Sequence, residues 1–278
     1  MRRIGVLYNP LSEQSIQLSH ELCDWLRARG LDVWHGVSHE GREEPSALDD
    51  MDLLIALGGD GTVLRAAHLA LAKGGHIPVL PVALGHLSFM AELQPEELYD
   101  GVATLLDGGG WHDERTLITA TIQCDECAPR QVLALNEIIV GRGELNRVVQ
   151  VDVEIYGARL TTYVADGVIV ATATGSTAYA LAAGGPIVDP RSRALTLVPI
   201  AAHLTNLPSV VLHEDVVVRL RLQSRHEALF SSDGRESIAL HAHDWVEVRR
   251  APQTCVFARV HPMSTFYMSL TQRLRRAP

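Results

Sequence analysis

The first hundred residues contain short apolar runs separated by segments in which apolar residues recur with helical period. The runs favour strands buried on both faces of a sheet, and the periodic segments favour helices. The predicted strands cover residues 3–8, 31–35, 53–57 and 77–83, and the predicted helices cover residues 15–28, 63–71 and 95–106. A polar, acidic connection spans residues 39–50. Strands that alternate with helices in this way predict a mostly parallel α/β sheet.

The pattern changes after the three glycines at positions 108–110. From Leu117 onward, most segments alternate apolar with polar residues, as strands with one buried face do. The strands predicted in this half include residues 149–155, 216–222, 245–248 and 255–258. We therefore predict an N-terminal α/β domain over residues 1–108 and a β-rich domain over residues 109–262.

The composition is that of an ordinary globular protein. The 278 residues suffice for two modest domains, and 47% of them are hydrophobic and 21% charged. The net charge of −9 argues against nucleic acid or an anionic membrane as the main partner. No apolar stretch is long enough to span a bilayer. The apolar residues after Met1 end at Asn9-Pro10 without a cleavage pattern, which predicts a first strand and not a signal peptide.

Two of the 4 cysteines, Cys124 and Cys127, have the spacing of a metal or redox pair. No second pair completes a zinc site. We interpret Cys124 and Cys127 as reduced thiols beside a hairpin turn. Reduced thiols predict a cytoplasmic protein.

The turn of residues 58–62, Gly-Gly-Asp-Gly-Thr, joins a buried strand to a helix. Glycines let the backbone approach a ligand closely, and the helix start directs unpaired N–H groups at the same place, which favours phosphate. Asp60 would repel phosphate unless it contacts a metal ion or takes a proton from an attacking hydroxyl. The alternative is that Asp60 only caps the helix. The chain has no GxxxxGK[ST] motif and no GxGxxG motif, so it resembles neither a P-loop enzyme nor a dinucleotide-binding protein with the usual fingerprint.

A second candidate turn, rich in Thr, Gly and Ser, follows the strand ending near Ala171. Its hydroxyl and N–H groups suit a neutral polar ligand, such as a ribose or an adenine ring beside Tyr179. The alternative is a local turn that caps a packing helix. Asn136-Glu137 could hold ribose hydroxyls or form an ordinary turn, and Ser232-Asp233-Gly234 predicts a hairpin turn.

Taken together, these motifs resemble the NAD kinase family, also called ATP-NAD or polyphosphate/ATP-NAD kinases. The resemblance covers nearly the whole chain. The first turn alone is shared with lipid kinases of the diacylglycerol and sphingosine type. The motifs that separate the families are Asn136-Glu137, Ala165-Asp166-Gly167, residues 174–179 and Gly184-Gly185-Pro186.

The resemblance implies a Rossmann-like N-terminal domain, a β-sandwich-like C-terminal domain and a final helix over residues 264–276 that packs on the first domain. It implies transfer of the terminal phosphoryl of ATP or polyphosphate to the 2′-hydroxyl of the adenosine ribose of NAD, which gives NADP. A divalent metal, Mg²⁺ by preference, takes part, and no residue of this chain is assigned as its ligand. Family members form homodimers or homotetramers.

The resemblance also implies roles for individual residues. Asp60 matches the general base. The residues that match the phosphate-binding turn and its basic neighbour are Gly58, Gly59, Gly61, Thr62 and Arg65. The residues that match the NAD-binding positions are Asn136, Glu137, Asp166, Thr177, Ala178, Tyr179 and Asp233.

The chain departs from the family pattern at several positions. Ala83 and Ser88 lie in a segment where the family usually has Asn-x-Gly-x-x-Gly-Phe, Val164 replaces a frequent arginine, and Ala182 replaces a frequent serine. Residues 203–208 are a looser version of a family motif. In our interpretation, the loss of this arginine and serine either weakens dinucleotide affinity or shifts the preference between NAD and NADH. The alternatives to an NAD kinase are a kinase for a lipid or another small alcohol, and a dinucleotide-binding protein without activity.

Overall fold

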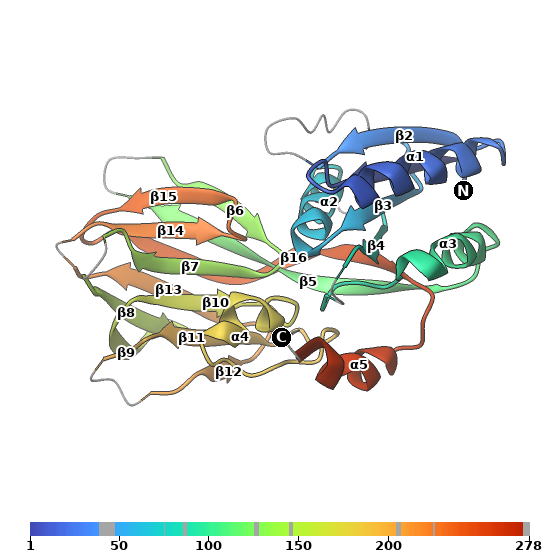
Figure 1. Ribbon diagram of the computed structural model, residues 1–278. Coiled ribbons are helices and arrows are strands. Elements are labelled where there is room, and N and C mark those ends of the chain that lie inside the picture. Colours follow the sequence, from blue (N-terminus) through green and yellow to red (C-terminus); the bar gives the residue numbers. More distant parts are fainter. Residues whose placement is uncertain are drawn as a thin grey trace. The chain divides into compact units, whose positions relative to one another are not determined.

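A computed structural model (Figure 1) describes residues 1–38, 48–74, 76–85, 88–124, 128–144, 147–203, 207–224 and 226–274. The chain forms two compact units. The first comprises Met1–Glu114 and Cys255–Pro278, and the second comprises Arg115–Thr254. Two long strands, β5 (Trp111–Gln123) and β16 (Trp245–Arg259), each contribute residues to both units. No helix in the described part of the chain is long and apolar enough to cross a membrane.

The first unit contains a parallel sheet with strand order β2-β1-β3-β4. The strands are β1 (Arg3–Tyr8), β2 (Asp32–Val37), β3 (Leu53–Gly58) and β4 (Val79–Ala83). The end of β16 adds to the β4 edge, where Phe257 pairs with Val79. Every residue of β3 and β4 is buried, which explains why their sequences are apolar throughout.

Helices pack against this sheet (Figure 1). They are α1 (Glu13–Arg27), α2 (Asp60–Ala72) and α3 (Leu98–Leu106), which the short η2 (Pro95–Glu97) precedes. A further helix, α5 (Thr265–Leu274), follows β16 and has no buried residue. Residues of α1 and α3 share one apolar cluster with β1, β3 and β4. Arg273 of α5 donates to the carbonyl oxygens of Ser88 and Phe89 at 2.6 and 2.7 Å.

The second unit contains a six-stranded antiparallel sheet with strand order β12-β11-β10-β7-β14-β15. These strands are β7 (Glu137–Arg142), β10 (Gly167–Ala171), β11 (Leu195–Ile200), β12 (Val210–Leu212), β14 (Ala228–Ser232) and β15 (Glu236–Leu240). The short helix α4 (Tyr179–Ala182) contributes Ala180 to a small apolar cluster with β10 and β11.

The other strands of this unit are β6 (Arg130–Ala134), β8 (Val149–Ile155), β9 (Ala158–Ala165) and β13 (Val217–Leu222). β9, β8, β13 and the first part of β16 pair in that order, and β6 pairs with β5. The inward residues of all these strands and of the six-stranded sheet form one large apolar cluster. Two sheets that share one core in this way form a β-sandwich.

The fold class predicted from the sequence is confirmed, with an α/β part and a strand-rich part. The prediction of separate strands at residues 245–248 and 255–258 is wrong, because β16 is continuous from Trp245 to Arg259. Pro252 interrupted the apolar pattern. It is exposed and lies between Arg249, which pairs with β13, and Phe257, which pairs with β4. Most of the acidic connection at residues 39–50 lies outside the described residues.

Candidate active site

The turn between β3 and α2 carries the Gly-rich motif. β3 ends at Gly58 and α2 begins at Asp60, so Gly59 is the N-cap residue. The amides of Thr62 and Val63 donate to the Gly59 carbonyl oxygen at 2.9 and 3.2 Å. A helix start leaves the amides before them without an acceptor in the helix. These donors and the helix dipole favour an anion at this turn.

The three glycines of this turn have different surroundings. A Cβ atom at Gly58 would lie 2.4 Å from Thr62 Oγ1, so the packing of the turn requires this glycine. A Cβ atom at Gly59 would have no neighbour within 4 Å, and one at Gly61 would lie 3.9 Å from Arg65 Nη1. Packing therefore does not require glycine at positions 59 and 61, whose exposed backbone a ligand can approach closely. Thr62 is 3% exposed, so its hydroxyl packs inside the turn.

Asp60 is exposed in the first turn of α2. No side chain caps this helix, so the interpretation of Asp60 as a capping residue is wrong. Within the described part of the chain, its carboxylate has no hydrogen bond and no ion pair. Arg65 lies one turn later, and its Nη1 is 3.4 Å from Ser38 Oγ. An exposed carboxylate and a cation beside an anion-binding turn are a set of groups suited to phosphoryl transfer.

In the second unit, Asn136 and Glu137 lie where β7 begins, and the carboxylate of Asp233 holds them. Asp233 Oδ1 accepts the amides of Asn136 and Glu137 at 2.8 and 3.0 Å, and Oδ2 accepts the amide of Leu135 at 2.8 Å. Asp233 and Gly234 form the β14–β15 hairpin turn with φ values of 50° and 66°, as the sequence predicts. The structure thus joins two motifs about a hundred residues apart in the chain.

Glu137 is a buried acid with an incomplete set of hydrogen bonds. It is 6% exposed, and its Oε2 atom has no partner among the described residues. Burial and the nearby Asp233 charge raise the pKa of Glu137 to about 8, although the Tyr179 amide, which donates to it, acts in the opposite direction. At neutral pH this group is therefore largely protonated and can donate a hydrogen bond.

The turn after β10 packs directly on the Asn136 backbone. The Thr172 amide donates to the Asn136 carbonyl oxygen at 2.9 Å, and the Thr172 hydroxyl donates to the Leu135 carbonyl oxygen at 2.6 Å. A Cβ atom at Gly175 would lie 2.0 Å from the Asn136 carbonyl oxygen. Only glycine fits at position 175, so the Thr/Gly/Ser turn and the Asn136-Glu137 motif form one packed unit.

Thr177, Ala178 and Tyr179 follow as a short 3-10 turn, η3 (Gly175–Thr177), and the start of α4. Tyr179 is 45% exposed, while Thr177 and Ala178 are half-buried, so this segment can present an aromatic ring to a ligand. Arg115 Nη1 donates to the Thr174 hydroxyl at 3.1 Å and supports the turn from inside.

Asp166 lies between β9 and β10 and forms an ion pair with Arg142, whose Nη1 atom is 3.1 Å from Asp166 Oδ1. Both side chains are partly exposed. Val164, which replaces the family's arginine, forms an isolated bridge with His203. Arg142 of β7 therefore supplies a positive charge beside Asp166, a contact that sequence reasoning missed.

Two family models match the chain, the ATP-NAD kinase N-terminal domain over residues 39–109 and the ATP-NAD kinase C-terminal domain over residues 135–260. An NAD kinase of Chloroflexus aggregans is 61% identical over 277 residues, with 100% of both chains covered. The chain belongs to the NAD kinase family. An NAD kinase of Dehalococcoides mccartyi is 38% identical, with 99% of this chain and 96% of the relative covered.

Two solved structures share the NAD kinase fold with this chain. Yeast NADH kinase complexed with NADH has a TM-score of 0.82 at 21% identity, covering 98% of this chain and 87% of that chain. An NAD kinase from Archaeoglobus fulgidus in complex with ATP has a TM-score of 0.79 at 21% identity, covering 100% of both chains. At this identity the likeness is one of fold.

The positions at which the chain departs from the NAD kinase pattern lie in different surroundings. Ala83 is buried at the end of β4, and Ser88 accepts the Ala91 amide at 3.0 Å. Ala182 is exposed on α4. None of these three positions disturbs the described hydrogen bonds of the two candidate turns. In the looser motif at residues 203–208, positions 204–206 lie outside the described residues.

The cysteines partly differ from the prediction. Cys23 and Cys255 are buried and not disulfide-bonded, and burial raises the pKa of the Cys23 thiol to about 11. Cys124 is disulfide-bonded, so the prediction of a reduced thiol is wrong there. Cys127 lies outside the described residues. A short CxxC spacing allows either state, and sequence alone could not decide between them.

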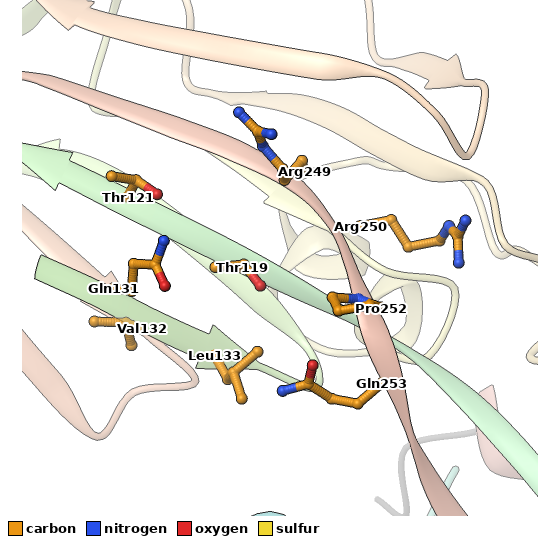
Figure 2. A pocket seen from close by; sticks show the side chains of 9 residues that line it. All are labelled: Thr119, Thr121, Gln131, Val132, Leu133, Arg249, Arg250, Pro252 and Gln253. Atoms are coloured by element: carbon orange, nitrogen blue, oxygen red, sulfur yellow. The ribbon is translucent and has the colours of Figure 1, made fainter.

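The second unit also contains a cavity of about 570 Å³. Figure 2 shows that residues of β5, β6 and β16 line it, and none of the predicted site residues is among them. Two arginines border it, but Arg249 forms an ion pair with Glu247, and Arg250 lies 3.6 Å from Glu214. In Figure 2 the Arg250 side chain points away from Thr119. These pairs leave little positive charge for a phosphate, so we do not assign substrate to this cavity.

Proposed function

We propose that this protein is an NAD kinase that transfers the terminal phosphoryl group of ATP to the 2′-hydroxyl of the adenosine ribose of NAD, giving NADP. The membership of the full chain in the NAD kinase family is the observation that carries this proposal. In the reaction the ribose oxygen forms a bond to the terminal phosphorus, the bond between that phosphorus and ADP breaks, and the hydroxyl proton leaves.

Asp60 is our candidate for the general base that accepts this proton. Its exposed carboxylate, without a hydrogen bond or ion pair among the described residues, is free to accept one. Gly58, Gly59 and Gly61 form the phosphate-binding turn in this proposal, with Thr62 contributing to its packing. Arg65 neutralises phosphate charge.

The β-rich domain, residues 109–262 in our division, binds the dinucleotide. Asn136 and Glu137 hydrogen-bond a ribose, and Asp166 binds on the nicotinamide side. Tyr179 offers an aromatic face to adenine, with Thr177 and Ala178 beside it. The exposed ring of Tyr179 and the unsatisfied Oε2 of Glu137 support these roles.

A divalent cation, Mg²⁺ in our proposal, enters with ATP. The described residues contain no group of three or more side chains that could hold a metal ion. Mg²⁺ commonly keeps several waters and binds substrate phosphates, so it does not need a dedicated cage of protein ligands. When bound, the cation neutralises charge on the transferred phosphoryl group.

We also propose a cytoplasmic enzyme that assembles as a homodimer or homotetramer. Light scattering of the purified protein measures the subunit number.

The test is NADP formation from NAD, ATP and Mg²⁺ by the purified protein, with product analysis that locates the new phosphate. We expect NADP with the phosphate at the adenosine 2′-oxygen, and loss of the product when EDTA removes the cation. Parallel reactions with polyphosphate and with NADH determine the donor and acceptor range.

Two other outcomes would replace the proposal. NAD binding without NADP from any donor would indicate a binding protein without activity. Phosphorylation of diacylglycerol or another alcohol, but not of NAD, would indicate a different kinase built on the same turn.

A further inference from the structure

The segment Leu135–Glu137 is fixed by hydrogen bonds on every backbone polar group. Its three amides donate to the Asp233 carboxylate. Its three carbonyl oxygens accept from the Thr172 hydroxyl, the Thr172 amide and the Asp233 amide, at 2.6, 2.9 and 3.1 Å. All three amide donors are used and each carbonyl oxygen already accepts one donor, so the side chains of Asn136 and Glu137 are the groups best able to contact a ligand.

Asp233 itself has little left to offer a ligand. Its two carboxylate oxygens accept three backbone amides, and it is 7% exposed. A buried carboxylate that receives three N–H groups is satisfied where it is. A carboxylate also suits this task better than an amide, because an amide has only one acceptor oxygen for donors that reach both ends of the group.

Glu137, in contrast, has an unsatisfied atom. Its Oε2 is buried without a partner among the described residues. Buried polar atoms in native proteins nearly always have a partner, and an exception beside a rigid segment indicates a group that awaits a ligand. The contrast separates two roles that the family resemblance had merged into one list of dinucleotide-binding residues.

We propose that Asp233 is a positioning residue for NAD binding, which does not contact NAD but fixes the Leu135–Glu137 backbone so that Asn136 and Glu137 face the dinucleotide. Thr172 holds the same segment from its carbonyl side. This inference rests on the proposed function, since it takes NAD as the ligand of Asn136 and Glu137.

The test compares the NAD dissociation constant, measured by calorimetry, with the KM for ATP in Asp233→Asn, Thr172→Val and Thr172→Ser. Asp233→Asn places an amide NH₂ group against a backbone N–H donor. We expect the NAD dissociation constant to rise about tenfold or more, with the KM for ATP changed less than about threefold. Thr172→Val should weaken NAD binding about three- to tenfold, whereas Thr172→Ser, which keeps the hydroxyl, should stay within about twofold.

The pH dependence of NAD binding distinguishes the proposed role of Asp233 from a non-specific disturbance of the structure. Asp233→Asn removes one of the two influences that raise the pKa of Glu137. The pH midpoint of NAD binding should therefore move to lower pH in Asp233→Asn and stay in place in Thr172→Val, which removes no charge.

Unchanged NAD binding in a folded Asp233→Asn variant would overturn the proposal, as would an equal loss of affinity for NAD and ATP. If Asp233→Asn does not fold, the comparison of Thr172→Val with Thr172→Ser tests the proposal. Wild-type NAD affinity in Thr172→Val would then overturn it. Calorimetry needs no turnover. If the wild-type protein binds NAD without forming NADP, the proposed function is contradicted. The NAD affinities of the variants still test the positioning role of Asp233 in that case.

Discussion

The Gly-rich turn of the first unit and the Asn136-Glu137 segment of the second are held in opposite ways. In the first, Gly59 and Gly61 border open space, and Asp60 is exposed with no hydrogen bond or ion pair among the described residues. In the second, every backbone group of residues 135–137 is bonded. In the proposed function, the open turn suits groups that contact the transferred phosphoryl group, and the packed segment suits groups that recognise the dinucleotide.

Substitution of Asp60 should give the largest loss of activity and leave the stability of the fold nearly unchanged. We expect Asp60→Asn to lower kcat by about 10²–10⁴-fold, because the proton acceptor is lost. The free energy of unfolding should change by less than about 0.5 kcal/mol, because the side chain is exposed and unbonded. The measurements are initial rates of NADP formation and urea unfolding. Asp100→Asn, an exposed acid in the first turn of α3, is the matched control and should keep full activity.

Burial of the Glu137 carboxyl group should make the free energy of unfolding depend on pH. Its pKa is raised from 4.5 to about 8, so the folded state keeps a proton that the unfolded state loses. The stability contributed by this raised pKa is complete below about pH 4.5 and is lost as the pH rises through about 8. Glu137→Gln does not titrate, so its stability relative to the wild type should increase with pH in this window, by at most about 1.4 kcal/mol per pH unit.

Urea unfolding at pH 5, 7 and 9 measures this difference. Exposed Glu114→Gln controls for the loss of a carboxylate in general. A constant difference between Glu137→Gln and the wild type across the three pH values would contradict the raised pKa.

Glycine substitutions should separate the two regions by stability. Gly175→Ala places a Cβ atom 2.0 Å from the Asn136 carbonyl oxygen, and we expect it to cost about 1–3 kcal/mol or more in unfolding free energy. Gly59→Ala meets nothing within 4 Å at a φ of −87°, and its cost should stay below about 0.5 kcal/mol. If Gly59→Ala keeps full activity as well, the close approach of phosphate to this backbone is refuted.

The ion pair between Arg142 and Asp166 should give the smallest effect. Both side chains are partly exposed, at 34% and 26%, so solvent screens their attraction. We expect Arg142→Ala to change the unfolding free energy by less than about 1 kcal/mol. A double-mutant cycle with Asp166→Ala measures the coupling. A KM for NAD that rises only with Asp166→Ala would mean that Arg142 does not orient Asp166 for the ligand.

Much of the fold and of the candidate site follows from the sequence. Apolar runs such as Leu53–Gly58 predict the buried parallel strands, and the glycines and Asp60 beside them indicate a phosphate-binding turn, because these residues are adjacent in the chain. The Asp233-Gly234 turn has the positive φ values that such a pair predicts. The conformation of a turn or a strand depends mainly on residues that are adjacent in the chain, so a single sequence is enough to predict it.

Only the tertiary structure shows how the candidate dinucleotide-binding residues of the second unit are held in place. Asp233 reads as a turn residue in the sequence, yet its carboxylate holds the backbone of residues 135–137. Nothing in the sequence predicts a role for Thr172 or Arg142. In the structure, Thr172 hydrogen-bonds the Asn136 backbone, and Arg142 forms an ion pair with Asp166. These roles depend on contacts between strands that are distant in sequence, and strand pairing brings them together. Every residue type except proline carries the same backbone N–H and C=O groups, so a hydrogen bond to the backbone does not depend on which residue carries that group, and the sequence could not reveal it.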